Sequence, residues 1–480
     1  MSKYIFADSV FFACTTLFCF LALQGSLDLT PLGVNMDSDL QNYAQILESK
    51  RYPDAFTMDP VVPLFHADPG VPNLLTSIAQ LSFFGSDAAT ALLRVGNIAI
   101  FLHFLAYYIL GRYLFSLPSI AAILSLVMSI TVYWAFGTFW GNLHSDPVPR
   151  FFFADLWPFL FILALKATEK RSLQPVLFFL TGCCITVHTV STLMVGPMFF
   201  FAFAIQNTRL PLKSQIKELV KNGVFFAIPV VCYLAWLLYP FLALPTEQVF
   251  FDVRDLRFGN DFTNLHRVLG GILLKYCYAP PLLPTGLICW WVAYKNSQRL
   301  PNAAQQLVKL LPGLVFGILC MCCICAIEIT LAESISKNNM SQEILRGTRF
   351  LIPLSWLAIV TVVYLLFRRM PSELRACVVI GTIFALLIFM QEKQVIAARH
   401  ALAEYTGIKA LDTEKAQVLR KHNYAELEML NALRNNKDEY IFSPDDTMGI
   451  RYIAHCNLLP VYKDGNVIYY ARNKELANLW

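Results

Sequence analysis

Charged residues are scarce in this chain of 480 residues. Asp, Glu, Lys and Arg together make up 15% of it, whereas soluble proteins carry roughly 25%. Hydrophobic residues reach 56%, and the mean hydropathy is +0.52. So much apolar surface excludes intrinsic disorder. The net charge of +5 is small for this length and says little about nucleic acid; we expect no nucleic-acid partner. The composition favours a single polytopic membrane unit with a polar appendage.

Several catalytic motifs are also missing. The sequence has no glycine-rich phosphate loop, no His-Glu-x-x-His motif, no serine elbow and no internal repeat. These absences argue against a P-loop nucleotide hydrolase, a zinc protease of that motif and an α/β-hydrolase. Almost all of the 13 Cys lie in apolar segments, where Cys acts as a small hydrophobic residue. A disulfide-stabilised secreted scaffold is therefore excluded.

Long apolar segments dominate what is present. A membrane-spanning helix needs about 20 mostly apolar residues, and on that scale we expect about eleven transmembrane helices. The predicted segments are residues 4–27, 89–112, 119–140, 151–165, 173–188, 192–205, 224–244, 281–294, 311–331, 350–367 and 376–391.

The distribution of Lys and Arg predicts the orientation in the membrane. Cytoplasmic loops are enriched in these residues. With a cytoplasmic amino terminus, every inner loop carries at least one cation: Arg112; Lys166, Lys170 and Arg171; Arg209, Lys213, Lys217 and Lys221; Lys295, Arg299 and Lys309; Arg368, Arg369 and Arg375. An odd number of spans then places the carboxyl terminus outside the cytoplasm.

Two polar regions interrupt the apolar pattern. We expect a membrane module over residues 1–391, with a long first extracytoplasmic loop at 28–87. Residues 392–480 predict a small extracytoplasmic α/β domain, with helical spacing over 398–433, a strand within 439–446 and a β-hairpin at 458–471.

The first loop opens with two acids, Asp37 and Asp39, close to a predicted helix start. An ionised carboxylate facing a water-poor cavity can accept the proton of an attacking hydroxyl. Two carboxylates can instead hold a divalent cation. The alternative interpretation is purely structural: Asp39 caps the helix, and Asp37 is a solvated loop acid.

A second polar group lies in the next outer loop. His144 and Asp146 have a spacing that allows them to join the first pair in a metal or base site, and Arg150 follows them. Arg150 suits either a phosphate clamp or a side chain extended toward the membrane interface. The alternative is a simple loop turn, because Asp-Pro is a turn-forming pair.

Arginine also marks a late outer loop. Arg346 and Arg349 are spaced to share a helical face, and paired guanidinium groups suit phosphate. Their outer position runs against the charge bias of the other loops, so we expect them to bind an anion. Bulk lipid headgroups are the alternative ligand. His188, at a short outer bend, is either a cavity residue or a buried histidine with satisfied hydrogen bonds.

Together these features resemble the type-C (GT-C) glycosyltransferases, which use polyprenyl-phosphate-linked sugars. The long first loop with Asp37 and Asp39 resembles the acidic loop of that superfamily, Asp146 its second acid, and Arg346 or Arg349 its phosphate-binding arginine. Many members have an adjacent acidic pair, whereas this chain has one residue between the two acids.

The resemblance implies a membrane glycosyltransferase that moves a hexose or pentose from a polyprenyl-phosphate-linked donor to a hydroxyl of a glycan, lipid or protein acceptor. Asp37 or Asp39 would be the base, and inversion is expected. Arg346, Arg349, Arg150 and His188 would bind substrate. If a divalent metal ion takes part, its ligands would be Asp37, Asp39, His144 and Asp146.

Three other functions stay open. A multi-span secondary transporter is the main alternative, although such proteins usually show paired repeats and sites at the middle of the membrane. A lipid-linked polysaccharide polymerase or ligase would have its long loop late in the chain. A non-catalytic assembly subunit would tolerate loss of both early acids.

Overall fold

The computed structural model describes most of the chain. It covers residues 4–67, 74–81, 84–85, 87–133, 139–146, 148–242, 281–334, 344–368, 372–434, 440–441, 448–460, 464 and 474–479.

Seven helices within these residues are long and apolar enough to cross a membrane. Large apolar side chains such as Phe12, Ile98 and Val231 stand exposed along them, as expected for surfaces that face lipid. The chain is therefore an α-helical, multi-pass membrane protein. The seven helices are α1 (Ile5–Leu29), α4 (Ala88–Phe115), α6 (Pro149–Glu169), α8 (Thr189–Gln206), α9 (Leu212–Leu242), α13 (Asn302–Ser334) and α15 (Leu351–Phe367), the last preceded by the 3-10 helix η11 (Arg346–Phe350).

Four further helices coincide with the remaining apolar segments but are shorter. They are α5 (Pro118–Ser129), α7 (Gln174–Cys183), α12 (Leu282–Lys295) and α16 (Glu373–Leu387). Each predicted span thus overlaps a helix, whereas only seven of these helices reach the length of a full crossing.

The segment predicted as a helix over residues 119–140 departs most from expectation. Helix α5 ends at Ser129, and the chain continues as an antiparallel pair of short strands, β1 (Val132–Tyr133) and β2 (Phe139–Trp140). Gly141 follows with φ +96°, and a Cβ there would lie 2.4 Å from the Ile130 carbonyl oxygen. Only glycine allows the strand pair to close against the helix end, a requirement that hydropathy does not reveal.

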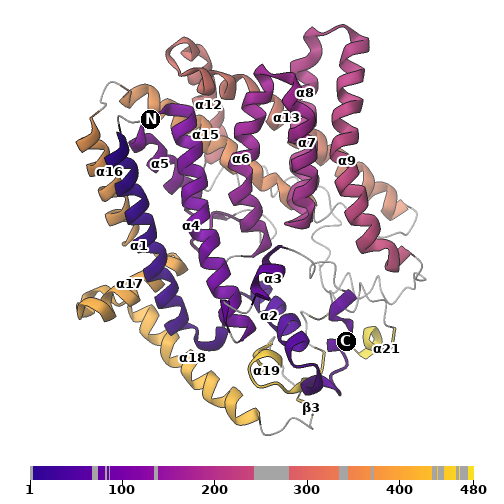
Figure 1. Cartoon of the computed structure of the whole chain (residues 1–480), viewed down its shortest axis with the longest axis vertical. Coiled ribbons are helices and arrows are strands. Elements are labelled where there is room, and N and C mark those ends of the chain that lie inside the picture. The colour runs from indigo at the N-terminus through magenta and orange to yellow at the C-terminus, as the bar shows by residue number, and fades with distance from the viewer. Residues whose placement is uncertain are drawn as a thin grey trace.

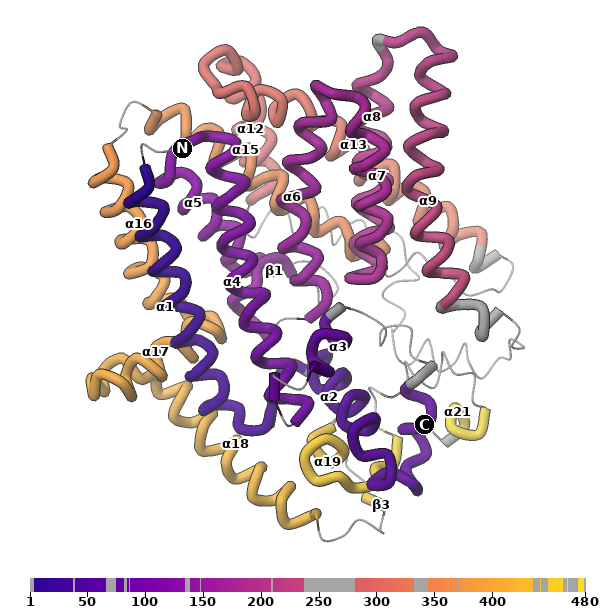
Figure 2. The backbone as a smooth tube through the Cα atoms, in the orientation of Figure 1, coloured from indigo at the N-terminus to yellow at the C-terminus, as the bar shows by residue number. Residues whose placement is uncertain are grey.

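The bundle is assembled from helices that are consecutive in the chain and from helices distant in sequence. Helix α1 packs on α17 (Lys393–Thr406), α4 on α5 and α6, α8 on α13, and α12 on α15; Figures 1 and 2 show these neighbours. Small residues allow close approach between helices. At Gly25 of α1, a Cβ would overlap the Ala397 carbonyl of α17.

One end of the bundle carries most of the polar elements, and we call it the loop end. It contains α2 (Ser38–Arg51), α3 (Leu74–Ala79), α18 (Glu414–Leu433) and α19 (Gly449–Tyr452), whereas the amino terminus lies at the opposite end (Figure 1). Short elements complete the described chain: η2 (Pro31–Gly33), η3 (Pro53–Phe56), η4 (Val62–Ala67), η6 (Arg171–Leu173), η7 (Cys184–Thr186), η8 (Asn207–Arg209), η10 (Ser297–Arg299), η12 (Lys409–Leu411), β3 (Tyr440–Ile441), β4 (Asn457–Leu458) and α21 (Lys474–Leu479).

The carboxyl-terminal segment differs in detail from its prediction. The helical spacing over 398–433 is broken at Gly407, which has φ +71° and ends α17 before α18 begins. Strand β3 pairs with β4 in parallel. Most of the predicted hairpin at 458–471 lies outside the described residues.

A buried ionic cluster joins this segment to the first loop. Arg451 Nε lies 2.7 Å from Asp59 Oδ2, and its Nη1 lies 2.9 Å from Asp464 Oδ1. All three side chains are fully buried. A buried charge is tolerated only when it is paired, so the carboxyl-terminal residues and the first loop depend on each other.

Candidate functional site

Asp37 begins the first helix of the loop end. It is the N-cap of α2, and its Oδ1 accepts a hydrogen bond from the Asp39 backbone N–H at 3.0 Å. The capping residue is therefore Asp37, not Asp39 as the structural interpretation of the sequence supposed. Asp37 is half-buried, while Asp39 is exposed in the first turn.

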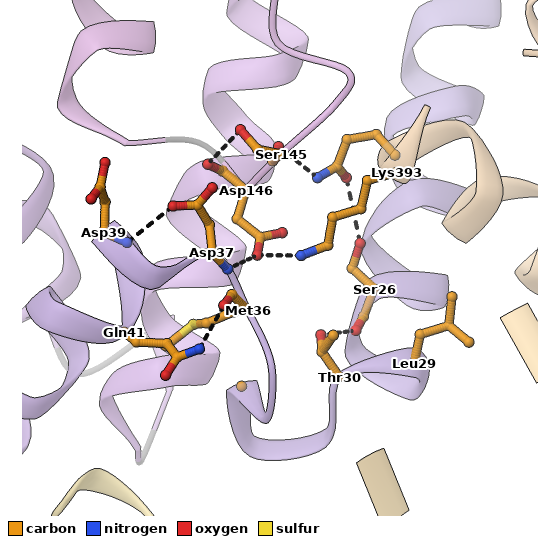
Figure 3. Close-up of polar contacts among 12 residues, drawn as sticks. Ser26, Leu29, Thr30, Met36, Asp37, Asp39, Gln41, Ser145, Asp146 and Lys393 are labelled. Atoms are coloured by element: carbon orange, nitrogen blue, oxygen red, sulfur yellow. Dashed lines mark hydrogen bonds and ion pairs between the residues drawn. The ribbon is translucent and has the colours of Figure 1, made fainter. Parts of the chain in front are cut away.

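Asp146 lies directly beside Asp37, as Figure 3 shows. Its Oδ2 accepts a hydrogen bond from the Asp37 backbone N–H at 2.8 Å and lies 2.5 Å from Lys393 Nζ. Asp146 is 1% exposed. Its Oδ1 is buried and has no hydrogen-bond partner among the described residues. Three segments distant in sequence therefore meet at one carboxylate.

The surroundings of Asp37 favour its protonated form. Burial raises the pKa of the Asp37 carboxyl, and the nearby charges of Asp39 and Asp146 raise it further. The Asp39 N–H bond and the Arg150 guanidinium lower this pKa in part. The net shift is upward, so Asp37 holds a proton more readily than an exposed aspartate does.

Arg150 faces the acids from the first turn of α6. Its Nη1 lies 3.8 Å from Asp39 Oδ2. The guanidinium lies over the rings of Phe139 and Phe151, 4.4 Å and 5.4 Å from their centroids. Stacking on aromatic rings holds a guanidinium plane in place, so Arg150 is fixed beside Asp39.

Arg349 and His188 meet through Ser191. Arg349 Nη2 donates to the Ser191 hydroxyl at 2.7 Å, and that hydroxyl lies 2.8 Å from His188 Nδ1. His188 is the N-cap of α8, where its Nδ1 accepts the Ser191 backbone N–H. Arg349 is 4% exposed and Ser191 fully buried.

The charges of three guanidinium groups act on His188. Burial lowers the pKa of His188, and the charges of Arg349, Arg150 and Arg346 lower it further. The imidazole is therefore neutral near pH 7. Because Arg150 also lies against Asp39, it connects the acidic side of the site with the side formed by His188 and the late arginines.

His144 is paired with Glu392. Its Nδ1 is 3.3 Å from Glu392 Oε2, and its Nε2 is bonded to the Tyr133 hydroxyl. The structure brings together Asp37, Asp39, Asp146 and Arg150, and it directs His144 toward the start of α17.

The contacts do not favour the metal site predicted from these acids. The Lys393 ammonium already forms an ion pair with Asp146 Oδ2, and His144 is paired with Glu392. In the part of the chain that the structure describes, no group of three or more His, Cys, Asp or Glu side chains is arranged to hold a metal ion. Metal dependence stays a prediction.

Sequence reasoning missed two pairings. The sequence around Lys393 gave no indication of its contact with Asp146, because the two residues are distant in the chain. His103 of α4 and Asp155 of α6 are both buried, with His103 Nδ1 2.8 Å from Asp155 Oδ1. Here a signal existed: an acid inside an apolar segment is a candidate functional residue.

No protein-family model matches the chain, and no curated protein sequence matches it. The interpretation of the site rests on its residues and their geometry.

Proposed function

We propose that the protein is a membrane glycosyltransferase that moves a sugar from a polyprenyl-phosphate-linked donor to an acceptor hydroxyl. One observation carries the proposal: Arg150 lies 3.8 Å from Asp39 and its charge also acts on His188, which Ser191 joins to Arg349. A base next to an anion-binding group, at the loop end of a membrane bundle, suits a donor with a lipid tail and a phosphate.

Asp37 is the proposed base. It is half-buried beside Asp146, and its raised pKa brings it nearer to the range useful for proton transfer. The acceptor hydroxyl gives its proton to the Asp37 carboxylate while its oxygen attacks the anomeric carbon. The bond from that carbon to the phosphate oxygen breaks, and the polyprenyl phosphate leaves with the electron pair. This direct displacement inverts the anomeric centre.

The arginines are proposed to stabilise the leaving group. Guanidinium groups form paired hydrogen bonds to phosphate, and preorganised cations stabilise charge that develops in the transition state. Arg349 is buried and held by Ser191, so its orientation is set before substrate arrives. Because His188 is neutral, the positive charge available to the phosphate comes from the arginines.

The membrane arrangement is part of the proposal. We propose eleven crossings, in which α5, α7, α12 and α16 supply the four shorter ones, with the amino terminus cytoplasmic and the loop end extracytoplasmic. Asp54 lies exposed at the loop end and Lys217 lies exposed near the start of α9. A Cys at 54 should react with a membrane-impermeant thiol reagent added to intact cells, and a Cys at 217 should not. The reverse pattern of labelling would show that the orientation in the membrane is opposite to the one proposed.

The Asp37→Asn variant tests the chemistry. We expect transfer from a lipid-linked donor in proteoliposomes to fall by a factor of about a hundred or more, the range given for general base catalysis. Asp54→Asn is the matched control, because Asp54 is an exposed acid in the same loop. Unchanged transfer in Asp37→Asn would remove the base assignment.

A secondary transporter is a second candidate, which the buried pair His103 and Asp155 favours. Both residues lie inside spanning helices, away from the loops. If the pair carries transported protons, Asp155→Asn should abolish solute-coupled proton flux in liposomes. A glycosyltransferase should show no such flux in either form of the protein.

A further inference from the structure

We infer that Lys393 is the built-in counter-ion of the acidic site, and that it positions Asp37 through Asp146. The inference rests on the proposed function and extends it, because it assigns a residue beyond the last apolar helix to the active site. Lys393 contacts Asp146 and reaches Asp37 only through that carboxylate, so its assigned role is that of a positioning residue.

The contacts form a short chain from Lys393 to Asp37. Lys393 Nζ lies 2.5 Å from Asp146 Oδ2, and the same oxygen accepts the Asp37 backbone N–H at 2.8 Å. Figure 3 shows the three residues converging, with Lys393 and Asp37 on opposite sides of the carboxylate. Asp146 is 1% exposed, whereas the Lys393 side chain is 25% exposed. The ammonium therefore reaches a buried carboxylate from a partly open side.

The first turn of α17 is itself firmly attached to this loop. The Gln394 backbone N–H donates to the Leu143 carbonyl at 2.9 Å, and its side-chain amide donates to the Ser145 carbonyl at 3.1 Å. Helix α17 also packs closely against α1 at Gly25. Lys393 therefore lies on a helix turn that is held firmly in place, as accurate positioning of a side chain requires.

The charge balance explains why a cation is needed here. A buried carboxylate without a counter-charge is strongly destabilising. A divalent ion bridging Asp146 and the acids of α2 would supply that charge, and Lys393 supplies it instead at Asp146 Oδ2. A metal ion on the same oxygen would be repelled by the ammonium. We therefore expect sugar transfer to continue after chelation of divalent ions.

A second set of contacts shows the same dependence on the carboxyl-terminal segment. The stretch before Asp37 contains Asn35 in the left-handed region, with φ +57°. Asn35 donates to Asn423 Oδ1 at 2.8 Å, and Asn423 donates to the Leu29 carbonyl at 2.5 Å. The Tyr452 hydroxyl donates to the Gly33 carbonyl at 2.8 Å. Residues of α18 and α19 thus hold this stretch in an unfavourable backbone conformation.

The first test compares Lys393→Met with Lys393→Arg. We expect Lys393→Met to lower kcat by about tenfold or more while the donor KM changes by less than about twofold, because the arginine side of the site stays intact. Lys393→Arg should recover most of the lost kcat. Lys415→Met, which removes an exposed Lys on α18, is the matched control and should behave as wild type.

Restoring the ammonium separates positioning from general damage. In Lys393→Cys, alkylation with 2-bromoethylamine should raise kcat, whereas the same treatment of the wild type should not. A kcat of Lys393→Met within about twofold of wild type would overturn the inference. A loss that neither Arg nor the restored ammonium repairs would also overturn it.

A stability measurement keeps the inference testable if no sugar transfer is found. Lys393→Asp and Asp146→Lys should each lower the unfolding temperature in detergent, and the double variant should recover a large part of that loss. Absence of recovery would overturn the Lys393 pairing. Absence of transfer in the wild type, with recovery present, would instead contradict the proposed function alone.

Discussion

The guanidinium of Arg150 lies 3.8 Å from the carboxylate of Asp39 and is stacked over Phe139. The same guanidinium contributes to the lowered pKa of His188. One side chain therefore links the early acidic loop with the late cationic group.

Arg150 variants should reveal this linking role. We expect Arg150→Gln to lower kcat/KM by about tenfold to a hundredfold, because a stacked guanidinium contributes both charge and fixed geometry. Arg150→Lys should recover only part, since an ammonium cannot reproduce the stacked plane. Steady-state transfer assays measure both effects. Arg171→Gln, an exposed arginine in η6, is the control, and equal losses in Arg171→Gln and Arg150→Gln would contradict the assignment.

Arg349 should act mainly on the donor. Arg349→Gln removes a buried cation that is oriented by Ser191, so we expect the donor KM to rise by about tenfold, the equivalent of 1.4 kcal/mol. Ser191→Ala should give a smaller rise, because the guanidinium keeps its charge and loses only its orientation. Titration with lipid-linked donor measures the change, and an unaltered donor KM in Arg349→Gln would argue against a phosphate clamp.

Some of this site could be predicted from the sequence. The apolar segments predict helices because hydropathy is a local property. The helix start near the acids of the first loop could be predicted because capping residues are also a local signal. The length of α5 could not be predicted, since its end depends on the close approach of Gly141, which follows β2, to Ile130. The pairing of Lys393 with Asp146 is also non-local, and nothing near either residue indicates its partner.

His400 should make the stability of the fold depend on pH. Its Nε2 lies 2.6 Å from Asp28 Oδ2 and its Nδ1 2.9 Å from Asp412 Oδ1. Burial lowers the pKa of His400, but the two carboxylates raise it more, so the net pKa lies above the ordinary value. The protonated form stabilises the fold, and this contribution is complete below the unfolded-state pKa and is lost as pH rises through the folded-state value.

Thermal unfolding in detergent, measured from below the unfolded-state pKa of His400 to above its folded-state pKa, tests this dependence. The wild type should lose stability with rising pH more steeply than His400→Gln, which cannot titrate. Arg420 also lies 3.3 Å from Asp28, and it is present in both proteins that are compared. Parallel curves for the two proteins would exclude His400 as the source.

The buried cluster of Arg451 should be essential for stability. We expect Arg451→Met to destabilise the protein by about 3–5 kcal/mol, because it leaves Asp59 and Asp464 buried without a counter-charge. Lys421→Met, on the exposed face of α18, should have little effect. Unfolding measurements in detergent compare the two, and a loss in Arg451→Met no larger than in Lys421→Met would show that the cluster is not needed.

The central claim is that base and phosphate clamp act on one bound donor. Single-turnover transfer, with protein in excess over a radiolabelled polyprenyl-phosphate sugar, tests it most directly. Asp37→Asn should bind the donor as tightly as wild type and transfer none within the wild-type turnover time, whereas Arg349→Gln should bind it weakly. Wild-type transfer by Asp37→Asn, or wild-type donor binding by Arg349→Gln, would contradict the claim.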